Sequence, residues 1–159
     1  MSAKTIIATL TRANQTLACA ESLTGGMLLA ALTAIPGASA VLRGGVVAYQ
    51  TQMKHILAGV AQDVLAEFGP VSEQTASELA LGVQRVCDSD WGVATTGVAG
   101  PTRQDGHDVG EVWIAITSPK GWVQGVAVKR FNFTGDRFEI RAQTVAAALD
   151  MFAETAGIK

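Results

Sequence analysis

The sequence has few of the features that mark several common classes of protein. Its 159 residues include only two cysteines, Cys19 and Cys87, and both lie in apolar runs typical of buried free thiols rather than of a disulfide framework. Lysine and arginine are scattered and the net charge is −2, so nothing suggests a nucleic-acid partner. The longest apolar run, 27–35, is about half of a membrane span, and the N-terminus lacks the pattern of a secretory signal. We therefore expect a cytoplasmic protein with no nucleic-acid and no membrane partner.

The sequence does contain enough apolar residues for a folded core. Hydrophobic residues make up 48% of the chain and charged residues 16%, which excludes a disordered protein. The length suits one domain, and the sequence contains no internal repeat, linker or low-complexity tract. Residues 1–159 are therefore expected to form a single domain.

Helical and strand-like patterns alternate over the first two thirds of the chain. Ser2 and Ser72 are the expected caps of the first helix and of the clearest one. This order predicts an α/β fold in which helices cover a mixed β-sheet. Helices are expected at about 3–11, 24–35, 51–58 and 61–68, from 73 and from 137, and strands at 15–21, 44–50, 91–97, 111–117 and 123–133.

The end of the chain is predicted to form a hairpin followed by a helix. The last two strands would be joined by the turn 118–122, in which proline and glycine interrupt the strand pattern. Asp136 and Glu139 form an acidic variant of the capping box at the start of the helix. Five apolar residues recur at helical spacing and are expected to share one face of this helix: Phe138, Ala142, Val145, Leu149 and Phe152.

Three of the expected strands end in clusters of polar residues. The first cluster is 21–26, the second is 49–54, and the third is 95–97. Ligands of α/β sheets bind beyond the carboxyl ends of the strands, so these clusters predict a binding site.

Ser22 is the candidate nucleophile of this site. It follows a buried strand and precedes a helix, and the glycine pair Gly25–Gly26 lets the backbone approach a ligand closely. Free amides at a helix start favour negative charge, so they could hold the oxyanion of an acyl-transfer reaction. The alternative is that Ser22 or Thr24 only caps the helix.

Lys54 is the candidate base for such a serine. A lysine can accept a proton if burial keeps its amine neutral, which is the Ser–Lys variant of the catalytic triad. Tyr49 ends the preceding strand, and its hydroxyl could relay the proton or hold the amine. The alternative for Lys54 is a solvated lysine on the surface of a helix.

The remaining polar candidates have equally open interpretations. Thr95 and Thr96 could hold an oxyanion or a substrate hydroxyl, or they could simply fill the strand as β-branched residues. Arg137 and Arg141 lie one helical turn apart and could clamp a phosphate, or they could pair with carboxylates at the surface. His107 lies among carboxylates in 105–111, but no second histidine or cysteine lies at ligand spacing, so we predict a polar loop and no metal site.

Taken together, the motifs give the chain a resemblance to a known family from about Gln15 to Ala153. The motifs are AESLTGG, GGVVAYQTQMK, FGPVSEQTA, ATTGVAGP, VG-VWIAI (with Glu111 at the gap) and FTGDRFEIR. In order and spacing they resemble the CinA C-terminal domain family. Active members of that family are nicotinamide-nucleotide amidohydrolases, which convert nicotinamide mononucleotide to nicotinate mononucleotide and ammonia. The resemblance implies a three-layer α/β/α sandwich, this activity without a cofactor, a small-molecule nucleotide as substrate, and self-association into a homo-oligomer.

The resemblance also implies roles for individual residues. Ser22 matches the nucleophile, Lys54 the general base, Tyr49 the residue beside the base, and Thr96 the hydroxyl that assists at the reacting centre. Gly25 and Gly26 would lend backbone amides, and Arg141 would bind the phosphate. Glu21, Thr24, Thr95 and Gly97 complete the expected substrate-binding set.

The loop 102–108 departs from the family pattern. Members usually continue with a glycine-rich run and a KPVG motif, whereas here His107 stands in the place of the lysine and Asp108 in that of the proline. If that lysine binds the phosphate, a mostly neutral imidazole would weaken nucleotide affinity. The alternatives to an enzyme are a non-catalytic nucleotide-binding module and a competence-linked interaction protein.

Overall fold

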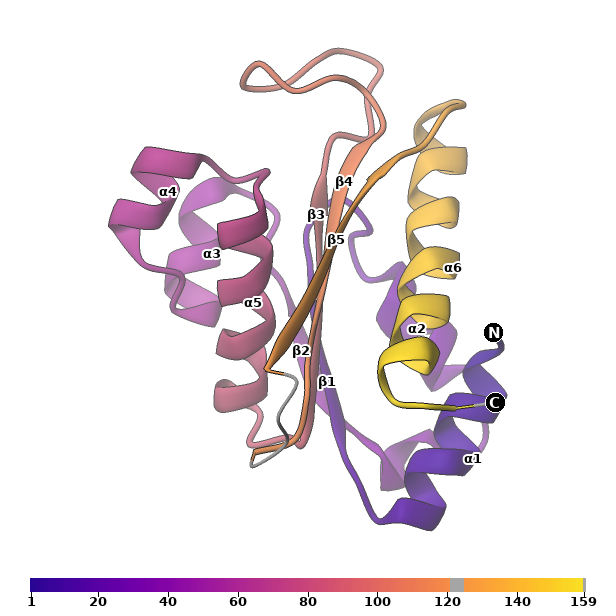
Figure 1. Ribbon diagram of the computed structural model, residues 1–159. Coiled ribbons are helices and arrows are strands. Elements are labelled where there is room, and N and C mark those ends of the chain that lie inside the picture. Colours follow the sequence, from indigo (N-terminus) through magenta and orange to yellow (C-terminus); the bar gives the residue numbers. More distant parts are fainter. Residues whose placement is uncertain (121–124, 159) are drawn as a thin grey trace.

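The structure is a computed structural model in which residues 1–120 and 125–158 are described. Five strands form one twisted sheet between two layers of helices (Figure 1). The strand order is β2-β1-β3-β4-β5, with β1 parallel to β2 and β3, and with β4 antiparallel to β3 and β5. The fold is therefore the expected α/β/α sandwich with a mixed sheet. The strands are β1 (Leu17–Glu21), β2 (Leu42–Val47), β3 (Trp91–Gly97), β4 (Glu111–Thr117) and β5 (Val126–Asn132).

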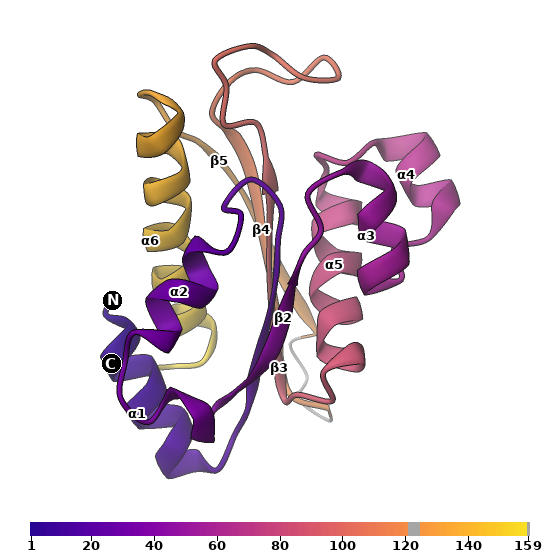
Figure 2. The same ribbon diagram turned by 180° about the vertical axis from the view of Figure 1, so that it is seen from behind.

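The helices divide between the two faces of the sheet. Figure 2, which shows the molecule from behind, has α1, α2 and α6 on one side and α3, α4 and α5 on the other. A short 3-10 helix, Ala38–Ala40, leads into β2. The helices are α1 (Ala3–Ala13), α2 (Met27–Thr33), α3 (Thr51–Ala58), α4 (Gln62–Phe68), α5 (Glu73–Val86) and α6 (Arg137–Thr155). None of the helices in the described part of the chain is long and apolar enough to span a membrane.

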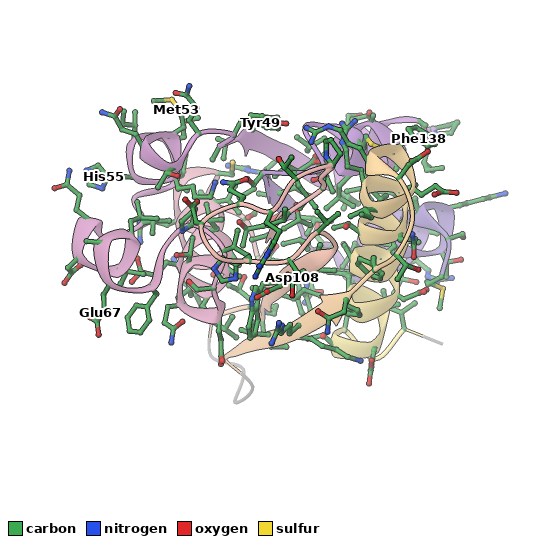
Figure 3. All side chains as sticks on the ribbon, turned by 90° about the horizontal axis from the view of Figure 1, so that it is seen from above. Tyr49, Met53, His55, Glu67, Asp108 and Phe138 are labelled. Atoms are coloured by element: carbon green, nitrogen blue, oxygen red, sulfur yellow. The ribbon has the colours of Figure 1, made fainter. Side chains whose placement is uncertain are left out.

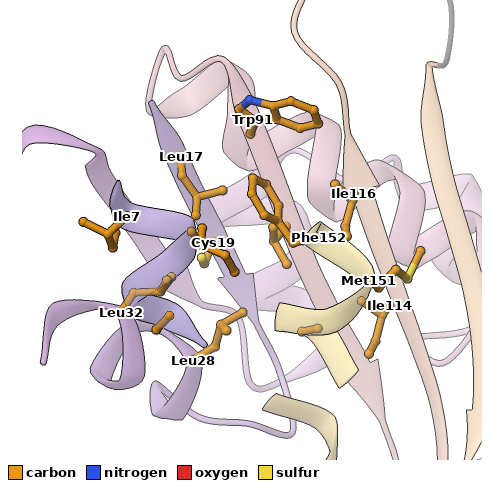
Figure 4. Packing of buried hydrophobic residues seen from close by; sticks show 14 of the residues in the cluster. Ile7, Leu17, Cys19, Leu28, Leu32, Trp91, Ile114, Ile116, Met151 and Phe152 are labelled. Atoms are coloured by element: carbon orange, nitrogen blue, oxygen red, sulfur yellow. The ribbon is translucent and has the colours of Figure 1, made fainter. Parts of the chain in front are cut away.

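The two faces of the sheet are packed with side chains of different size. The layer of α1, α2 and α6 contains large residues (Figure 4), among which Trp91 and Phe152 meet edge to face with ring centroids 5.2 Å apart. The layer of α3 and α5 is packed mostly by alanines from the sheet and from both helices. Small side chains let α5 lie close to the strands and let α3 lie close to α5.

Two glycines make this close approach possible. A Cβ at Gly92 of β3 would lie 2.2 Å from the carbonyl oxygen of Ala80 on α5. A Cβ at Gly82 of α5 would lie 1.8 Å from the carbonyl oxygen of Ala58 on α3. Any larger residue at either position would push α5 or α3 outward.

Most of the expected elements are confirmed, with small shifts of their ends. Ser2 caps α1 by accepting from the amide of Thr5, and Asp136 and Glu139 form the capping box of α6. The strand expected at 44–50 begins two residues earlier and ends three residues earlier, at 42–47. Part of the predicted turn 118–122 and the start of the strand predicted at 123–133 lie outside the described residues.

Two predictions about individual apolar residues are wrong. Phe138 is 66% exposed because it lies on the outer side of α6 (Figure 3), and the buried face of the helix runs instead from Ile140 through Thr144 and Ala148 to Phe152. Cys19 is fully buried as expected, but Cys87 is partly exposed; both are free thiols.

Candidate active site

The turn that follows β1 is held by the buried carboxylate of Glu21. Its Oε2 accepts hydrogen bonds from the amides of Gly26 and Leu28, each at 3.0 Å, and its Oε1 accepts from the amide of Leu29 at 2.8 Å. A carboxylate in this position satisfies amides at the start of α2 that have no partner within the helix. Glu21 therefore does not line the pocket described below, and its place in the expected substrate-binding set is not supported by the geometry.

The two glycines of the turn delay the start of α2. Gly25 and Gly26 have φ values of 57° and 98°, a conformation that L-residues rarely adopt, so the helix expected from residue 24 begins at Met27. Their amides are engaged, since that of Gly25 donates to the carbonyl oxygen of Ser22 and that of Gly26 to Glu21. The geometry therefore does not support the expectation that these amides hold an oxyanion.

Arg141 of α6 braces the same turn from the outside. Its Nε donates to the carbonyl oxygen of Leu23 at 2.9 Å, and its Nη2 donates to that of Thr24 at 3.0 Å. A Cβ at Gly25 would lie 3.2 Å from the Arg141 Nη2, so the guanidinium also needs the glycine. Arg141 thus holds the backbone of the turn, and it does not line the pocket.

Thr24 and Thr95 form a second internal support. Their hydroxyls lie 2.8 Å apart and both residues are completely buried. Glu21 is in register with Thr95 on the neighbouring strand, so both side chains point to the α2 and α6 face of the sheet. Neither threonine lines the pocket, although both were expected to bind substrate.

Ser22 and Lys54 meet on the opposite face of the sheet. The Lys54 Nζ donates to the Ser22 Oγ at 3.0 Å and to the carbonyl oxygen of Ala48 at 3.0 Å. Lys54 is 1% exposed, and burial lowers its pKa from 10.5 to about 8 because a charged amine loses its hydration there. An amine with this pKa is neutral in roughly a tenth of the molecules at pH 7. The alternative of a solvated surface lysine is thereby excluded.

A small pocket of about 70 Å³ opens beside this pair. Its walls come from the ends of β1 and β3, from α3, from the segment before α5, from the β3–β4 loop and from the start of α6. The lining residues are Ser22, Leu23, Tyr49, Lys54, Pro70, Val71, Thr96, Gly97, Ala99, Gln104 and Arg137. The pocket thus contains the predicted Ser22, Tyr49, Lys54, Thr96 and Gly97.

Thr96 presents its oxygen to the pocket with its proton already engaged. The hydroxyl donates to the carbonyl oxygen of Pro70 at 2.6 Å. With that proton used, the oxygen can only accept further hydrogen bonds, so it cannot stabilise an oxyanion. Thr95 and Thr96 are neighbours on β3, so their side chains point to opposite faces of the sheet. Of the two, only Thr96 faces the pocket and is available to a ligand.

Tyr49 lies at the mouth of the pocket rather than against Lys54. In Figure 3, which looks onto this end of the sheet, Tyr49 lies between α3 and α6. Its hydroxyl accepts from Arg137, whose other nitrogen donates to the carbonyl oxygen of Gly100 at 2.7 Å. The amine of Lys54 donates to the carbonyl oxygen of Ala48. This backbone carbonyl, and not the hydroxyl of Tyr49, holds the amine in place.

Three polar contributors to the pocket region were not predicted from the sequence, and a fourth, Arg137, was considered but not chosen. The carbonyl groups of Ala48 and Pro70 carry no sequence signal, because any residue supplies a carbonyl. Gln104 lies in a loop that was interpreted only through its departure from the family pattern. Arg137 had been considered beside Arg141, and the one-turn spacing alone could not show which guanidinium reaches the pocket.

The loop around His107 is a network of charges. The His107 Nδ1 lies 3.0 Å from Glu111 Oε1, and Glu111 Oε2 lies 3.1 Å from Arg130 Nη2. Among the described residues no group of three or more His, Cys, Asp or Glu side chains is arranged to hold a metal ion.

The geometry defines the class of protein: an α/β/α sandwich with a buried serine–lysine pair at the carboxyl ends of its parallel strands. Comparison with known proteins identifies the family within that class. The CinA C-terminal domain family matches residues 1–156, and the chain belongs to this family.

Relatives and solved structures agree with this assignment. The chain is 52% identical over 139 residues to a competence-damage inducible protein from Desulforamulus reducens. It is 42% identical over 146 residues to a CinA-like protein from Frankia casuarinae. These matches cover 87% and 92% of this chain but 33% of each relative, so the chain spans about a third of their length.

The crystal structures that resemble this fold are also of competence/damage-inducible proteins. That of CihA from Agrobacterium tumefaciens has a TM-score of 0.89 at 36% identity and covers 96% of this chain and 92% of that one. That of a protein from Klebsiella pneumoniae has a TM-score of 0.91 at 31% identity and covers 98% and 94%.

Proposed function

We propose that this chain is an amidohydrolase that hydrolyses the carboxamide of nicotinamide mononucleotide through an acyl-enzyme on Ser22. The observation that carries the proposal is the buried contact of 3.0 Å between Lys54 Nζ and Ser22 Oγ, together with the lowering of the Lys54 pKa to about 8. A nucleophile within hydrogen-bond reach of a base that is partly neutral near physiological pH is the requirement for this chemistry.

In the first half of the reaction the neutral Lys54 amine takes the Ser22 proton while Oγ forms a bond to the carboxamide carbon. The resulting oxyanion needs a donor, and the amide of Leu23 has no hydrogen-bond partner among the described residues. Leu23 also lines the pocket, and it directly follows the nucleophile. The amide of Leu23 therefore replaces those of Gly25 and Gly26 as our candidate for the oxyanion site.

In the second half the tetrahedral intermediate collapses and the carbon–nitrogen bond breaks. The Lys54 ammonium returns its proton to the leaving nitrogen, and ammonia departs. Thr96 Oγ1 can accept from the carboxamide NH₂ group and so orient it, because its own proton is donated to Pro70. Lys54 then takes a proton from a water that attacks the ester carbon; the bond from that carbon to Ser22 Oγ breaks, Lys54 returns the proton to Oγ, and nicotinate mononucleotide is released.

Arg137 is a better candidate for the phosphate than Arg141. Arg137 lines the pocket at its mouth, whereas both bonding nitrogens of Arg141 donate to the turn after β1. A guanidinium suits a phosphate because it can donate two parallel hydrogen bonds.

The proposal is tested by ammonia release from nicotinamide mononucleotide. We expect Ser22→Ala to reduce kcat by at least about a thousandfold, since the covalent intermediate can no longer form. Ser77→Ala, which removes a hydroxyl that contacts only Glu73 of its own helix, is the matched control and should retain full activity. No ammonia from the unmodified protein, or equal rates in the two variants, would contradict the proposal; tight binding without turnover would identify a binding module instead.

A further inference from the structure

The β3–β4 loop carries a small hairpin that reaches the pocket. Gln104 and His107 exchange both backbone hydrogen bonds, at 3.2 and 2.8 Å. The two residues between them, Asp105 and Gly106, have φ values of 48° and 82°, as expected for an Asp-Gly hairpin turn of type I′. Gln104 is the one member of this hairpin among the pocket-lining residues, so the hairpin brings an uncharged amide to the site.

The hairpin is anchored to the sheet through its other paired residue. The His107 imidazole contacts the carboxylate of Glu111 at 3.0 Å, and Glu111 is buried at the start of β4 and also paired with Arg130 on β5. Within the loop Arg103 contacts Asp108 at 2.8 Å and donates to the carbonyl oxygen of Gly106 at 3.1 Å. These contacts support the hairpin, and within it the Gln104 Nε2 donates to the Asp105 Oδ2 at 3.3 Å, which leaves the amide oxygen and the second N–H of Gln104 for a ligand.

The pocket has a buried end and an exposed end with different chemistry. Ser22 is 7% exposed and Lys54 1%, whereas Tyr49 is 53% exposed, and Gln104 and Arg137 are exposed too. The volume of about 70 Å³ is well below the ~300 Å³ at which pockets for drug-sized ligands begin. The buried end therefore has room for a reacting group, and the rest of a larger substrate must lie across the exposed end.

From this geometry we infer that Gln104 is a specificity-determining residue that hydrogen-bonds a hydroxyl of the substrate's sugar. The inference rests on the proposed function. A primary amide both donates and accepts, and so does a sugar hydroxyl, whereas the charge of Arg137 suits the phosphate. His107 is a positioning residue, because it acts only by holding the hairpin through Glu111.

The test compares two substrates, one with and one without the sugar. We expect Gln104→Ala to lower kcat/KM for nicotinamide mononucleotide roughly three- to tenfold, the effect of one hydrogen bond, chiefly through KM. The kcat/KM for nicotinamide, which lacks the sugar, should not change. If turnover of nicotinamide is below detection, its inhibition constant is measured instead, with the mononucleotide as substrate. Gln74→Ala, at an exposed glutamine on α5, is the control.

A double-mutant cycle tests the anchor. His107→Ala should raise KM for the mononucleotide without changing the value for nicotinamide, and Gln104→Ala with His107→Ala should lose no more than Gln104→Ala alone. Full additivity would show that His107 does not act through Gln104.

Two kinetic results would overturn the inference: an unchanged Gln104→Ala variant, or equal losses with both substrates. If the unmodified protein releases no ammonia at all, the proposed function fails separately. In that case the inference about Gln104 is tested by calorimetry with nicotinate mononucleotide. Weaker binding by Gln104→Ala than by the unmodified protein supports the inference, and equal binding by both or binding by neither overturns it.

Discussion

The two helical layers of this protein pack on the same sheet with side chains of different size. On the side of α1, α2 and α6 the core consists of large aliphatic and aromatic residues, and on the side of α3 and α5 it consists mostly of alanine. Large buried side chains contribute most of the hydrophobic free energy, at about 25 cal/mol for each Å² of apolar surface. The alanine-rich side contributes less of it but brings a helix within reach of a strand end, which is what the Ser22–Lys54 contact needs.

The same division separates neighbouring residues at the strand ends. Successive side chains of a strand point to opposite faces, so Glu21 and Thr95 support the turn on the large-residue side. Ser22 and Thr96 lie one residue further along and face the pocket on the alanine-rich side. One face of the sheet thus holds the large-residue core and the supports of the turn, and the other holds the pocket with the Ser22–Lys54 pair.

The largest effect is expected from Lys54→Met, which should lower kcat about a thousandfold. The variant should nevertheless be more stable to unfolding than the unmodified protein. The buried amine has a pKa of about 8 when folded and 10.5 when unfolded, so below pH 8 the folded state bears the full cost of a buried charge. Methionine removes that cost but leaves the Ala48 carbonyl without its donor, so the net gain near pH 7 should be about 1–2 kcal/mol.

The pH dependence of stability provides the control for Lys54→Met. Between pH 8 and 10.5 the unfolded chain binds more protons at Lys54 than the folded one, so the stability of the unmodified protein rises with pH. The advantage of the variant should therefore shrink over this range in urea titrations. An advantage that grows with pH would contradict the burial of a charged amine.

A pair of packing variants should separate the two faces. Phe152→Ala opens a cavity on the large-residue side and should lower the free energy of unfolding by about 3–5 kcal/mol, with kcat unchanged where the variant is folded. Gly82→Ala places a Cβ against the Ala58 carbonyl, displaces α3 and with it Lys54, and should cost about 1–3 kcal/mol together with a clear loss of kcat. Unfolding curves and ammonia release measure both. The comparison fails if Phe152→Ala loses kcat and Gly82→Ala keeps it.

Glu21→Gln should destabilise the protein by about 2 kcal/mol. The substitution removes a charge and one of two oxygens that together accept three backbone hydrogen bonds. The melting temperature should fall by about 4–8 °C. Glu73→Gln, at an exposed glutamate in the first turn of α5, should change it little. Equal shifts in the two variants would argue against a special role of the Glu21 carboxylate.

The pH dependence of activity should follow the proton on Lys54. Only the neutral amine can accept the Ser22 proton, so kcat/KM should rise about tenfold for each pH unit below 8 and level off above it. A profile of ammonia release from pH 6 to 9.5 checks this. A flat profile would remove Lys54 from the role of base.

The smallest effects are expected from two neighbouring threonines. Thr96→Val removes the acceptor in the pocket and should lower kcat/KM roughly three- to tenfold. Thr95→Val breaks the contact with Thr24 and should instead lower stability by about 1 kcal/mol with activity retained. If Thr95→Val is the variant that loses activity, the division between the two faces of β3 is wrong.

Much of the fold could be predicted from local patterns. The helices at 51–58 and after Ser72 and the strands at 91–97 and 111–117 match the structure, because apolar period, caps and glycines act within a few residues of one another. The polar clusters at the strand ends also indicated where a site would form. Ser22 and Lys54 were named as a pair from the properties of their side chains and from the family resemblance.

Other features depended on packing that no local pattern contains. Which of Arg137 and Arg141 reaches the pocket depends on how α6 is rotated against the sheet. The exposure of Phe138 depends on which side of α6 faces the sheet. The engagement of the Gly25 and Gly26 amides depends on the side chain of Glu21 turning back to the start of α2.

The sequence by itself determined the order of helices and strands, the family, and the residues able to do chemistry, because these follow from side-chain type and spacing along the chain. Only the tertiary structure decided which of those residues meet. Ser22 and Lys54 are 32 positions apart, and they come into contact because α3 packs closely on α5 on the alanine-rich side of the sheet, where Lys54 reaches the end of β1. That closeness also keeps water from the amine, so packing determines its protonation as well as its position.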